Sequence, residues 1–366
     1  MSVPILRNSE RSTFKRCPQR WWWSWRNGYR PMRDANPLWF GQGIHLALAE
    51  WYQEGSKRGP HPVETWEKFV ADEERFIPVD YEEDEYKLIE AKALGATMLN
   101  GYLEQYGRDD DWDVIATERT FKMPIKTQDG KAKLVDFVGT MDGVYRDLSN
   151  GEVWLMEHKT AKAIFLNHLP LDDQAGAYFM VATQALRSQG LIGKNEELQG
   201  IMYNFLRKGL PDVRPKNAEG LATNKPVRAH YVEALCDIGE DRKGLSKLTI
   251  SDLDLLAKKK KLQVIGEVSK VQPTPLFHRE PVWRSAGERR TTYYGIQAEA
   301  MHMKAMKGHK LPLYKNPTRD CSWDCSFYRM CVLHEAGEDW KEYAEAEFKK
   351  EDPYKDHRNN RKSASS

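Results

Sequence analysis

Residues 133–162 read KLVDFVGTMDGVYRDLSNGEVWLMEHKTAK, and this stretch decides the fold. β-Branched and aromatic residues crowd both of its ends, and Asn150-Gly151 between them is a strong hairpin signal. We therefore predict two β-strands joined by a polar turn. Because side chains alternate along a strand, Glu157 and Lys159 should share one face of the second strand while His158 points to the other.

Asp142 lies near the end of the first predicted strand and faces this Glu-x-Lys pair. Carboxylates are hard oxygen ligands that suit Mg²⁺ or Mn²⁺, and an ammonium group can orient and polarise an attacking water. The arrangement is what a metal-dependent phosphodiesterase requires. The alternative is a solvated hairpin that carries an ion pair, because an aspartate followed by Glu-x-Lys also occurs by chance in many chains.

Composition limits the classes of protein that the chain can belong to. Its 366 residues include 56 Lys and Arg against 54 Asp and Glu, so the net charge is +2 and any DNA-binding surface must be local. The mean hydropathy of −0.72 predicts a soluble protein without a membrane partner. The first residues lack the apolar core of a secretory signal, so we expect a cytoplasmic location, in the host cytoplasm if the protein is viral, and reduced cysteines.

The order of predicted elements indicates an α/β fold. Helical spacing comes first, over residues 9–26, 37–54 and 63–107, and is followed by strand patterns at 114–123 and in the central hairpin. A helix at 171–189 and a strand at 198–206 then complete a mixed central sheet flanked by helices.

We expect a single domain over residues 1–348. Its parts would be a helical N-terminal part, a catalytic sheet core and a helical C-terminal part, over residues 1–110, 111–210 and 211–348. The tail, residues 349–366, has no apolar periodicity and is expected to be disordered.

Four of the five cysteines form a pattern. Cys17 lies near the N-terminus, and Cys321, Cys325 and Cys331 lie together in CSWDCSFYRMC, a spacing suited to thiolates that converge on one metal. Zinc is the default metal for four such ligands, with His334 as a substitute ligand, and ordinary buried thiols are the third interpretation. Cys236 stands apart and is interpreted as a small buried hydrophobic residue.

Taken together, the motifs resemble the PD-(D/E)XK nuclease superfamily, and within it the RecB, AddB and Cas4-like exonucleases, over roughly residues 9 to 335. Residues 139–143, GTMDG, match the aspartate motif, and residues 157–159, EHK, match the E-x-K motif. The resemblance implies a restriction-endonuclease-like core with Asp142, Glu157 and Lys159 as catalytic residues. Asp142, Glu157, the carbonyl of His158 and the helical His45 would bind Mg²⁺ or Mn²⁺.

The same resemblance implies a role for the cysteines. In these exonucleases one distant N-terminal cysteine and three cysteines after the core hold a [4Fe–4S] cluster, which joins the two ends of the domain. Cys17, Cys321, Cys325 and Cys331 match that layout, with zinc as the alternative. The first C-terminal pair is separated by three residues here, whereas two are usual in the family.

Further residues are candidates near the site. Gln174 and Tyr178 match the family motif Q-x-x-x-Y, and their i, i+4 spacing puts them on one helix face, where they could reach the active site or DNA, or where the tyrosine packs in the core. Glu118, on the strand before the hairpin, is a candidate for a further metal ligand or for supporting one, with an ordinary surface glutamate as the alternative. Lys208 is a candidate phosphate contact.

Basic residues outside the core are candidates for DNA binding. The densest group, interleaved with aromatic residues that could stack on bases, is Arg279, Arg284, Arg289 and Arg290. Residues 258–261, KKKK, are most simply a solvated helix face, with contact to the DNA backbone as the alternative.

We therefore predict a metal-dependent DNA exonuclease that acts on DNA with a free or single-stranded end, in recombination, repair or viral DNA processing. The alternative is a non-catalytic DNA-binding scaffold that keeps the fold and the metal and serves a helicase or recombinase partner. No G-x-x-x-x-G-K-[ST] motif is present, so a motor would have to be supplied by that partner.

Overall fold

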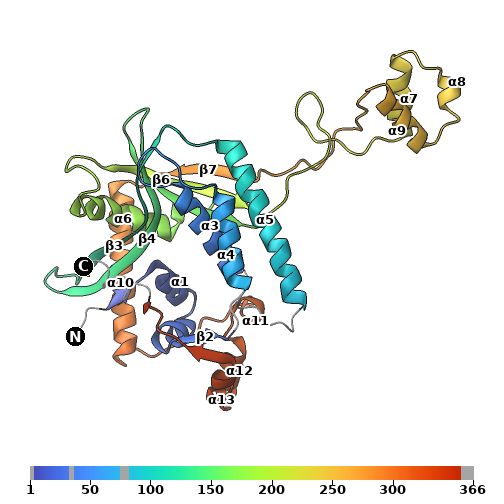
Figure 1. Ribbon diagram of the computed structural model, residues 1–366. Coiled ribbons are helices and arrows are strands. Elements are labelled where there is room, and N and C mark those ends of the chain that lie inside the picture. The colour runs from blue at the N-terminus through green and yellow to red at the C-terminus, as the bar shows by residue number, and fades with distance from the viewer. Residues whose placement is uncertain (1–3, 33–36, 75–81, 356–366) are drawn as a thin grey trace. The chain divides into compact units, whose positions relative to one another are not determined.

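The computed structural model describes residues 4–32, 37–74 and 82–355 (Figure 1). The strands are β1 (Ile5–Leu6), β2 (Tyr29–Pro31), β3 (Trp112–Lys126), β4 (Lys133–Asp147), β5 (Val153–Ala161), β6 (Leu198–Arg207), β7 (Phe277–Val282) and β8 (Phe348–Lys350). The α-helices are α1 (Asn8–Arg16), α2 (Pro18–Trp21), α3 (Pro37–Trp51), α4 (Pro62–Glu74), α5 (Glu82–Tyr106), α6 (Asp173–Ser188), α7 (Arg228–Asp237), α8 (Arg242–Leu245), α9 (Ile250–Lys259), α10 (Ala286–Lys307), α11 (Cys321–Asp324), α12 (Tyr328–Ala336) and α13 (Trp340–Glu347). A π-helix (Trp22–Arg26) follows α2, and a 3₁₀ turn (Leu169–Leu171) precedes α6.

A six-stranded mixed sheet forms the centre. Strand β4 pairs with β3 on one side and with β1 and β5 on the other, and β5, β6 and β7 continue the sheet. The β1–β4 and β5–β6 pairs are parallel, and the others are antiparallel. The predicted hairpin is therefore the middle of the sheet, as β-branched and aromatic residues on both of its strands indicated.

Helices pack against the sheet strands (Figure 1). Helix α6 packs on β3 and β6 and against α10, whereas α3 contacts β4 and β5 and α5 contacts β6. Helix α4 joins α3 to α5 through Trp66, which is fully buried. A Cβ atom at Gly43 of α3 or Gly95 of α5 would clash with the Trp66 ring, so these two glycines allow the helices that carry part of the site to pack closely.

The N-terminal and C-terminal segments meet in a second, small sheet. Strand β2 pairs antiparallel with β8, and an aromatic cluster that includes Trp23, Phe327 and Phe348 fills the space beside it. Tyr354 is buried and its hydroxyl donates to the Glu10 carboxylate at 2.7 Å. The prediction of a disordered tail was wrong for residues 349–355, because they pair and pack here; residues 356–366 lie outside the described residues.

The chain divides into two compact units. Unit 1 comprises residues 1–208 and 277–366, and unit 2 comprises residues 209–276. Unit 2 enters and leaves between β6 and β7, whose ends are paired at Leu206 and Phe277. The expectation of one undivided domain missed this insertion, because residues 211–348 were expected to form one helical C-terminal part.

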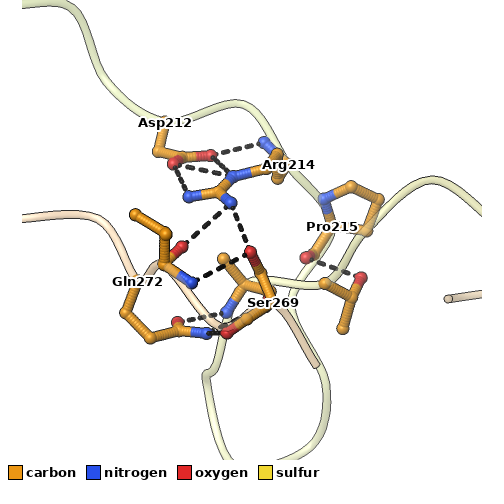
Figure 2. Close-up of polar contacts among 8 residues, drawn as sticks. Asp212, Arg214, Pro215, Ser269 and Gln272 are labelled. Carbon is orange, nitrogen blue, oxygen red and sulfur yellow. Dashed lines mark hydrogen bonds and ion pairs between the residues drawn. The ribbon is translucent and has the colours of Figure 1, made fainter. Parts of the chain in front are cut away.

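Two chain segments form the base of unit 2 (Figure 2). The Arg214 guanidinium donates to both carboxylate oxygens of Asp212, and also to Ser269 Oγ and the carbonyl of Val271, both at 3.0 Å. Gln272 accepts from the backbone of Ala222 at 2.8 Å. Beyond this base, α7, α8 and α9 surround a core of their own, made of Tyr231, Leu235, Leu245, Leu253 and Ala257. Across the described residues, no helix combines the length and apolarity that a membrane span needs.

Candidate metal centre

The two strands of the hairpin separate at the predicted acidic residues. Pairing between β4 and β5 ends at Gly143 and Met156, so the next residues along the two strands are Asp142 and Glu157. The backbone N–H of His158 donates to Asp142 Oδ2 at 2.7 Å instead of continuing the ladder. The Asp142 side chain is only 12% exposed, so its carboxylate is held nearly out of water at this opening.

Helix α3 supplies an imidazole to the same position. His45 Nδ1 lies 3.3 Å from Asp142 Oδ2. The neighbouring Ile44 and Leu48 are fully buried, so the apolar stripe of α3 fixes the helix and turns His45 toward the carboxylate.

Glu118 completes a group of three ligand-type side chains. One ligand atom from each of His45, Glu118 and Asp142 lies within 4.8 Å of the others, a spacing suited to a metal ion. Glu118 is opposite Asp142, between the pairs Thr117–Gly143 and Arg119–Met141, and its φ of 45° is left-handed. A left-handed non-glycine residue costs about 1–2 kcal/mol, and such strain is found where a side chain must be aimed at a site.

Electrostatics within this group are those of crowded carboxylates. Burial and the Asp142 charge raise the pKa of Glu118 to about 7. Burial would also raise the pKa of Asp142, but the imidazole of His45 and the His158 N–H outweigh it and lower that pKa. The pKa of His45 is raised, because the Asp142 carboxylate outweighs the effect of burial. A cation would relieve the repulsion between the two carboxylates.

Glu157 and Lys159 form a second polar cluster with α6. Lys159 Nζ donates to Glu157 Oε1 at 2.6 Å and to Gln174 Oε1 at 2.7 Å, and Gln174 Nε2 donates to Glu157 Oε1 at 2.7 Å. Glu157 is 3% exposed, and burial together with the Asp142 charge raises its pKa to about 7. Glu157 is thus close enough to Asp142 to feel its charge, although it is not among the three clustered ligand atoms.

Tyr178 lies one turn further along α6 and is buried against Phe121, with ring centroids 5.4 Å apart. Of the two residues of the Q-x-x-x-Y motif, Gln174 therefore reaches the acidic residues, and Tyr178 packs in the core.

The His158 side chain points away from Glu157, as strand alternation predicts. Its ring stacks on Tyr52 beside α3 and its Nδ1 lies 2.8 Å from Asn204 Nδ2. Burial lowers the pKa of His158 to about 3, so the imidazole is neutral. Only the backbone of His158 faces Asp142.

Arg279 belongs to this buried network. It lies on β7, donates to both oxygens of Asp109 at 2.7 and 2.8 Å and to Tyr102 at 2.8 Å, and is stacked between the rings of Tyr106 and Trp112. Its side chain is 15% exposed. The prediction that Arg279 contacts DNA was wrong, because both terminal nitrogens of its guanidinium donate to partners inside the protein.

The other predicted arginines are not gathered on one exposed surface. Arg284 is 9% exposed and donates to the carbonyls of Leu169 and Trp283, so it too is structural and the DNA-contact prediction was wrong for it. Arg289 is partly buried over the Phe179 ring, and Arg290 is exposed on α10.

A pocket of about 660 Å³ opens over the metal group. His45, Glu118 and Asp142 line it together with Thr160 and Lys208. Lys208 directly follows β6, and burial and the nearby Lys162 lower its pKa. The pocket is therefore lined both by carboxylates and by a lysine, a composition that suits a phosphodiester held by a metal.

Four cysteines from the two ends of the chain line another cavity, of about 220 Å³. The backbone N–H groups of Asn316 and Thr318 point at Cys17 Sγ and Cys321 Sγ at 3.5 and 3.3 Å. Burial raises the pKa of the two other thiols, those of Cys325 and Cys331. The cysteines are less tightly grouped than His45, Glu118 and Asp142. Within the described part of the chain, no cysteine sulfur belongs to a set of three ligand-type atoms that lie within 4.8 Å of one another.

The fold and the centre define a metal-dependent nuclease class, and comparison with known families agrees. A model of the PD-(D/E)XK nuclease superfamily matches residues 8–332. The chain belongs to the PD-(D/E)XK nuclease superfamily, whose members use divalent metals. No curated relative matches the chain. The predicted superfamily and the mixed-sheet fold class are confirmed, whereas the narrower RecB or Cas4 type stays a prediction.

Sequence reasoning underestimated Glu118. It was one of several candidates, because a strand glutamate gives no sign that its backbone is left-handed. One signal was present, since the strand that carries Glu118 is the neighbour of the strand that carries Asp142, and Gly143 lies across from the adjacent Thr117. The role of Asn204 in holding His158 had no signal in the sequence, because the two residues meet only when β5 and β6 pair.

Proposed function

We propose that this protein is a metal-dependent deoxyribonuclease, and that it is an exonuclease of the RecB or Cas4 type. The observation that carries the proposal is the convergence of His45, Glu118 and Asp142 within 4.8 Å in a pocket that also contains Lys208. Membership of the superfamily supports phosphodiester hydrolysis. The motif resemblance over both ends of the chain supports the exonuclease type.

The donor set fits Mg²⁺ or Mn²⁺, because two carboxylates and one imidazole are ligands that these ions accept. His45, Glu118 and Asp142 would hold the ion, and Glu157 would join them through Oε2, since both of its hydrogen bonds are to Oε1. The bound ion would activate a water and offset negative charge on phosphorus oxygens.

Lys159 and Gln174 have positioning roles in this proposal. Lys159 and Gln174 both donate a hydrogen bond to Glu157 Oε1, and Lys159 also donates to Gln174 Oε1. The three side chains therefore form a closed triangle of hydrogen bonds. The Glu157 charge raises the pKa of Lys159 despite burial, and the ammonium form is therefore kept at neutral pH. Lys159 would orient the attacking water and Gln174 would hold Lys159 in place. Lys208 would bind a substrate phosphate across the pocket.

We assign the four cysteines as ligands of a [4Fe–4S] cluster. All four cysteines line the same cavity, which brings the one N-terminal thiol together with the three C-terminal thiols. Backbone N–H groups aimed at Cys17 and Cys321 are typical of cluster thiolates. The cluster would join the first helices to α11 and α12.

Linear and covalently closed circular DNA, each incubated with the purified protein and Mn²⁺, test the proposal. An exonuclease degrades the linear form and leaves the circle intact. Cleavage of both forms at equal rates would replace the exonuclease assignment with an endonuclease. Binding without cleavage of either form would favour the non-catalytic scaffold.

A further inference from the structure

Unit 2 carries the net positive charge of the chain. Residues 209–276 include twelve lysines and arginines against nine aspartates and glutamates, a surplus of three, whereas the whole chain has a surplus of two. The remainder of the chain is therefore slightly acidic. A local basic region is the feature that electrostatic binding to DNA requires when the net charge is small.

Most carboxylates of unit 2 have partners within the unit. Asp241 caps α8, and the Asp252 carboxylate accepts from the backbone N–H and the hydroxyl of Thr249, the N-cap of α9. Asp254 pairs with Lys258 at 2.7 Å and Glu240 pairs with Lys260 at 2.6 Å. These contacts account for two of the four lysines in residues 258–261 and leave Lys259 and Lys261 exposed.

The Glu240–Lys260 ion pair also brings two basic segments together. Helix α8 begins with Arg242 and Lys243, and Glu240 lies two residues before its start. Lys260 directly follows the last residue of α9. Arg242, Lys243, Lys259 and Lys261 are all exposed. We call these four exposed residues, at the start of α8 and the end of α9, the α8–α9 surface; Figure 1 labels both helices.

Lys261 has an unusual backbone at the edge of this surface. Its φ is 54°, a left-handed conformation that glycine adopts without strain and that lysine does not. Attraction to the negative end of the α9 dipole can explain the lysines in the last turn of the helix, but that effect falls off beyond it. The left-handed backbone ends α9, since the N–H of Lys261 donates to the carbonyl of Lys258 at 3.0 Å and the N–H of Leu262 to that of Ala257 at 2.9 Å. Glycine is the usual residue at this position of a helix end, so the turn itself does not require a lysine.

We infer that the α8–α9 surface binds the phosphate backbone of DNA, as a site separate from the metal centre. The ligand class rests on the proposed function, which makes DNA the polyanion that this protein meets. Binding is electrostatic and independent of base sequence, because exposed lysine and arginine side chains contact phosphates rather than base edges. Apolar residues such as Leu255 are also exposed on this unit, at 58%, and would instead contact a protein partner if the inference is wrong.

The test compares two triple variants of the full chain. Lys243→Ala/Lys259→Ala/Lys261→Ala removes three charges from the α8–α9 surface, and Lys216→Ala/Lys225→Ala/Lys270→Ala removes three exposed lysines from the base of the same unit. Binding to a labelled duplex and to a labelled single strand is measured by fluorescence anisotropy in EDTA, over about 50 to 200 mM salt.

The first variant should bind at least about tenfold more weakly, and its salt slope should fall by about 0.9 per lysine on duplex and about 0.7 on single strand. The second should keep most of the wild-type affinity and slope. Equal slopes in the two variants would overturn the inference and favour the protein-partner alternative.

Lys261→Gly separates binding from folding. It relieves the left-handed strain, so its melting temperature should equal or exceed that of the wild type while DNA binding weakens. Unchanged DNA affinity would remove Lys261 from the surface. Hydrolysis of a small phosphodiester, bis(p-nitrophenyl) phosphate, with Mn²⁺ reports on the metal centre alone. Loss of DNA binding in the first variant with normal ester hydrolysis supports the inference. A wild type that hydrolyses neither ester nor DNA would refute the proposed function, whereas the binding measured in EDTA would still decide whether the α8–α9 surface holds DNA.

Discussion

Replacing Glu118 by glycine should separate two properties of this residue, its strained backbone and its carboxylate beside the metal centre. The residue has a left-handed backbone, which costs about 1–2 kcal/mol for a side chain other than glycine. Glycine loses more chain entropy on folding, by about 0.5–1 kcal/mol, so the metal-free Glu118→Gly protein should be more stable by about 0–1.5 kcal/mol. For a chain of this size that gain corresponds to a rise in melting temperature of about 0–3 °C.

The same substitution should weaken metal binding. Wild-type protein is stabilised by Mn²⁺ through RT ln(1 + [L]/Kd), and loss of one carboxylate should raise Kd at least about tenfold, or about 1.4 kcal/mol. The assay is differential scanning fluorimetry over a Mn²⁺ titration. Glu118→Gln is the matched control, because it removes the charge but keeps the left-handed strain.

In both variants the stabilisation by Mn²⁺ should fall by at least about 1.4 kcal/mol at saturating metal, and only Glu118→Gly should gain stability without metal. A glycine variant less stable than the glutamine variant would refute the account of the backbone. Undiminished stabilisation by Mn²⁺ in either variant would remove Glu118 from the metal centre.

Other predictions concern the rest of the molecule. Arg279→Met should cost about 3–5 kcal/mol in urea denaturation, because it leaves a buried carboxylate unpaired, and it should leave the salt dependence of DNA binding unchanged; a nearly silent substitution would contradict the buried-pair assignment. Mn²⁺ affinity should rise between about pH 6 and about pH 8, since the pKa values of Glu118 and Glu157 are both about 7 and a cation binds their ionised forms. Affinities measured by calorimetry that fall or stay level over this range would contradict the assignment of these glutamates as metal ligands. Cys17→Ser should lose the iron of anaerobically purified protein, about four atoms per chain in the wild type, whereas Cys236→Ser should keep it; one stoichiometric zinc in the wild type would replace the cluster.

The sequence predicted the central hairpin because each of its strands has a strong local pattern and the turn contains Asn150-Gly151. The opposite orientations of Glu157 and His158 followed from strand alternation alone. These features depend on neighbours in the chain, so no tertiary information was needed.

Features that depend on contacts between distant segments were missed. Arg279 is in a stretch with five basic residues, and only the pairing of β7 with β6 turns its guanidinium toward Asp109. The insertion of unit 2 was hidden because Pro- and Gly-rich segments look the same in a loop and in the base that Arg214 closes. The tail was misjudged for a similar reason, since Tyr354 is buried through contacts with the other end of the chain, where its ring packs near Trp25 and its hydroxyl donates to Glu10.

The central claim is that a metal held by His45, Glu118 and Asp142 cleaves DNA. Its most direct test is the rate at which wild-type and Asp142→Asn proteins cleave end-labelled linear DNA in Mn²⁺, with EDTA as the metal-free control and circular dichroism as the check on folding. We expect cleavage by the wild type only when metal is present, and a folded Asp142→Asn protein that is at least about a hundredfold slower, since a lost metal is worth several kcal/mol of barrier. Cleavage in EDTA, or a folded Asp142→Asn protein as fast as the wild type, would contradict the claim.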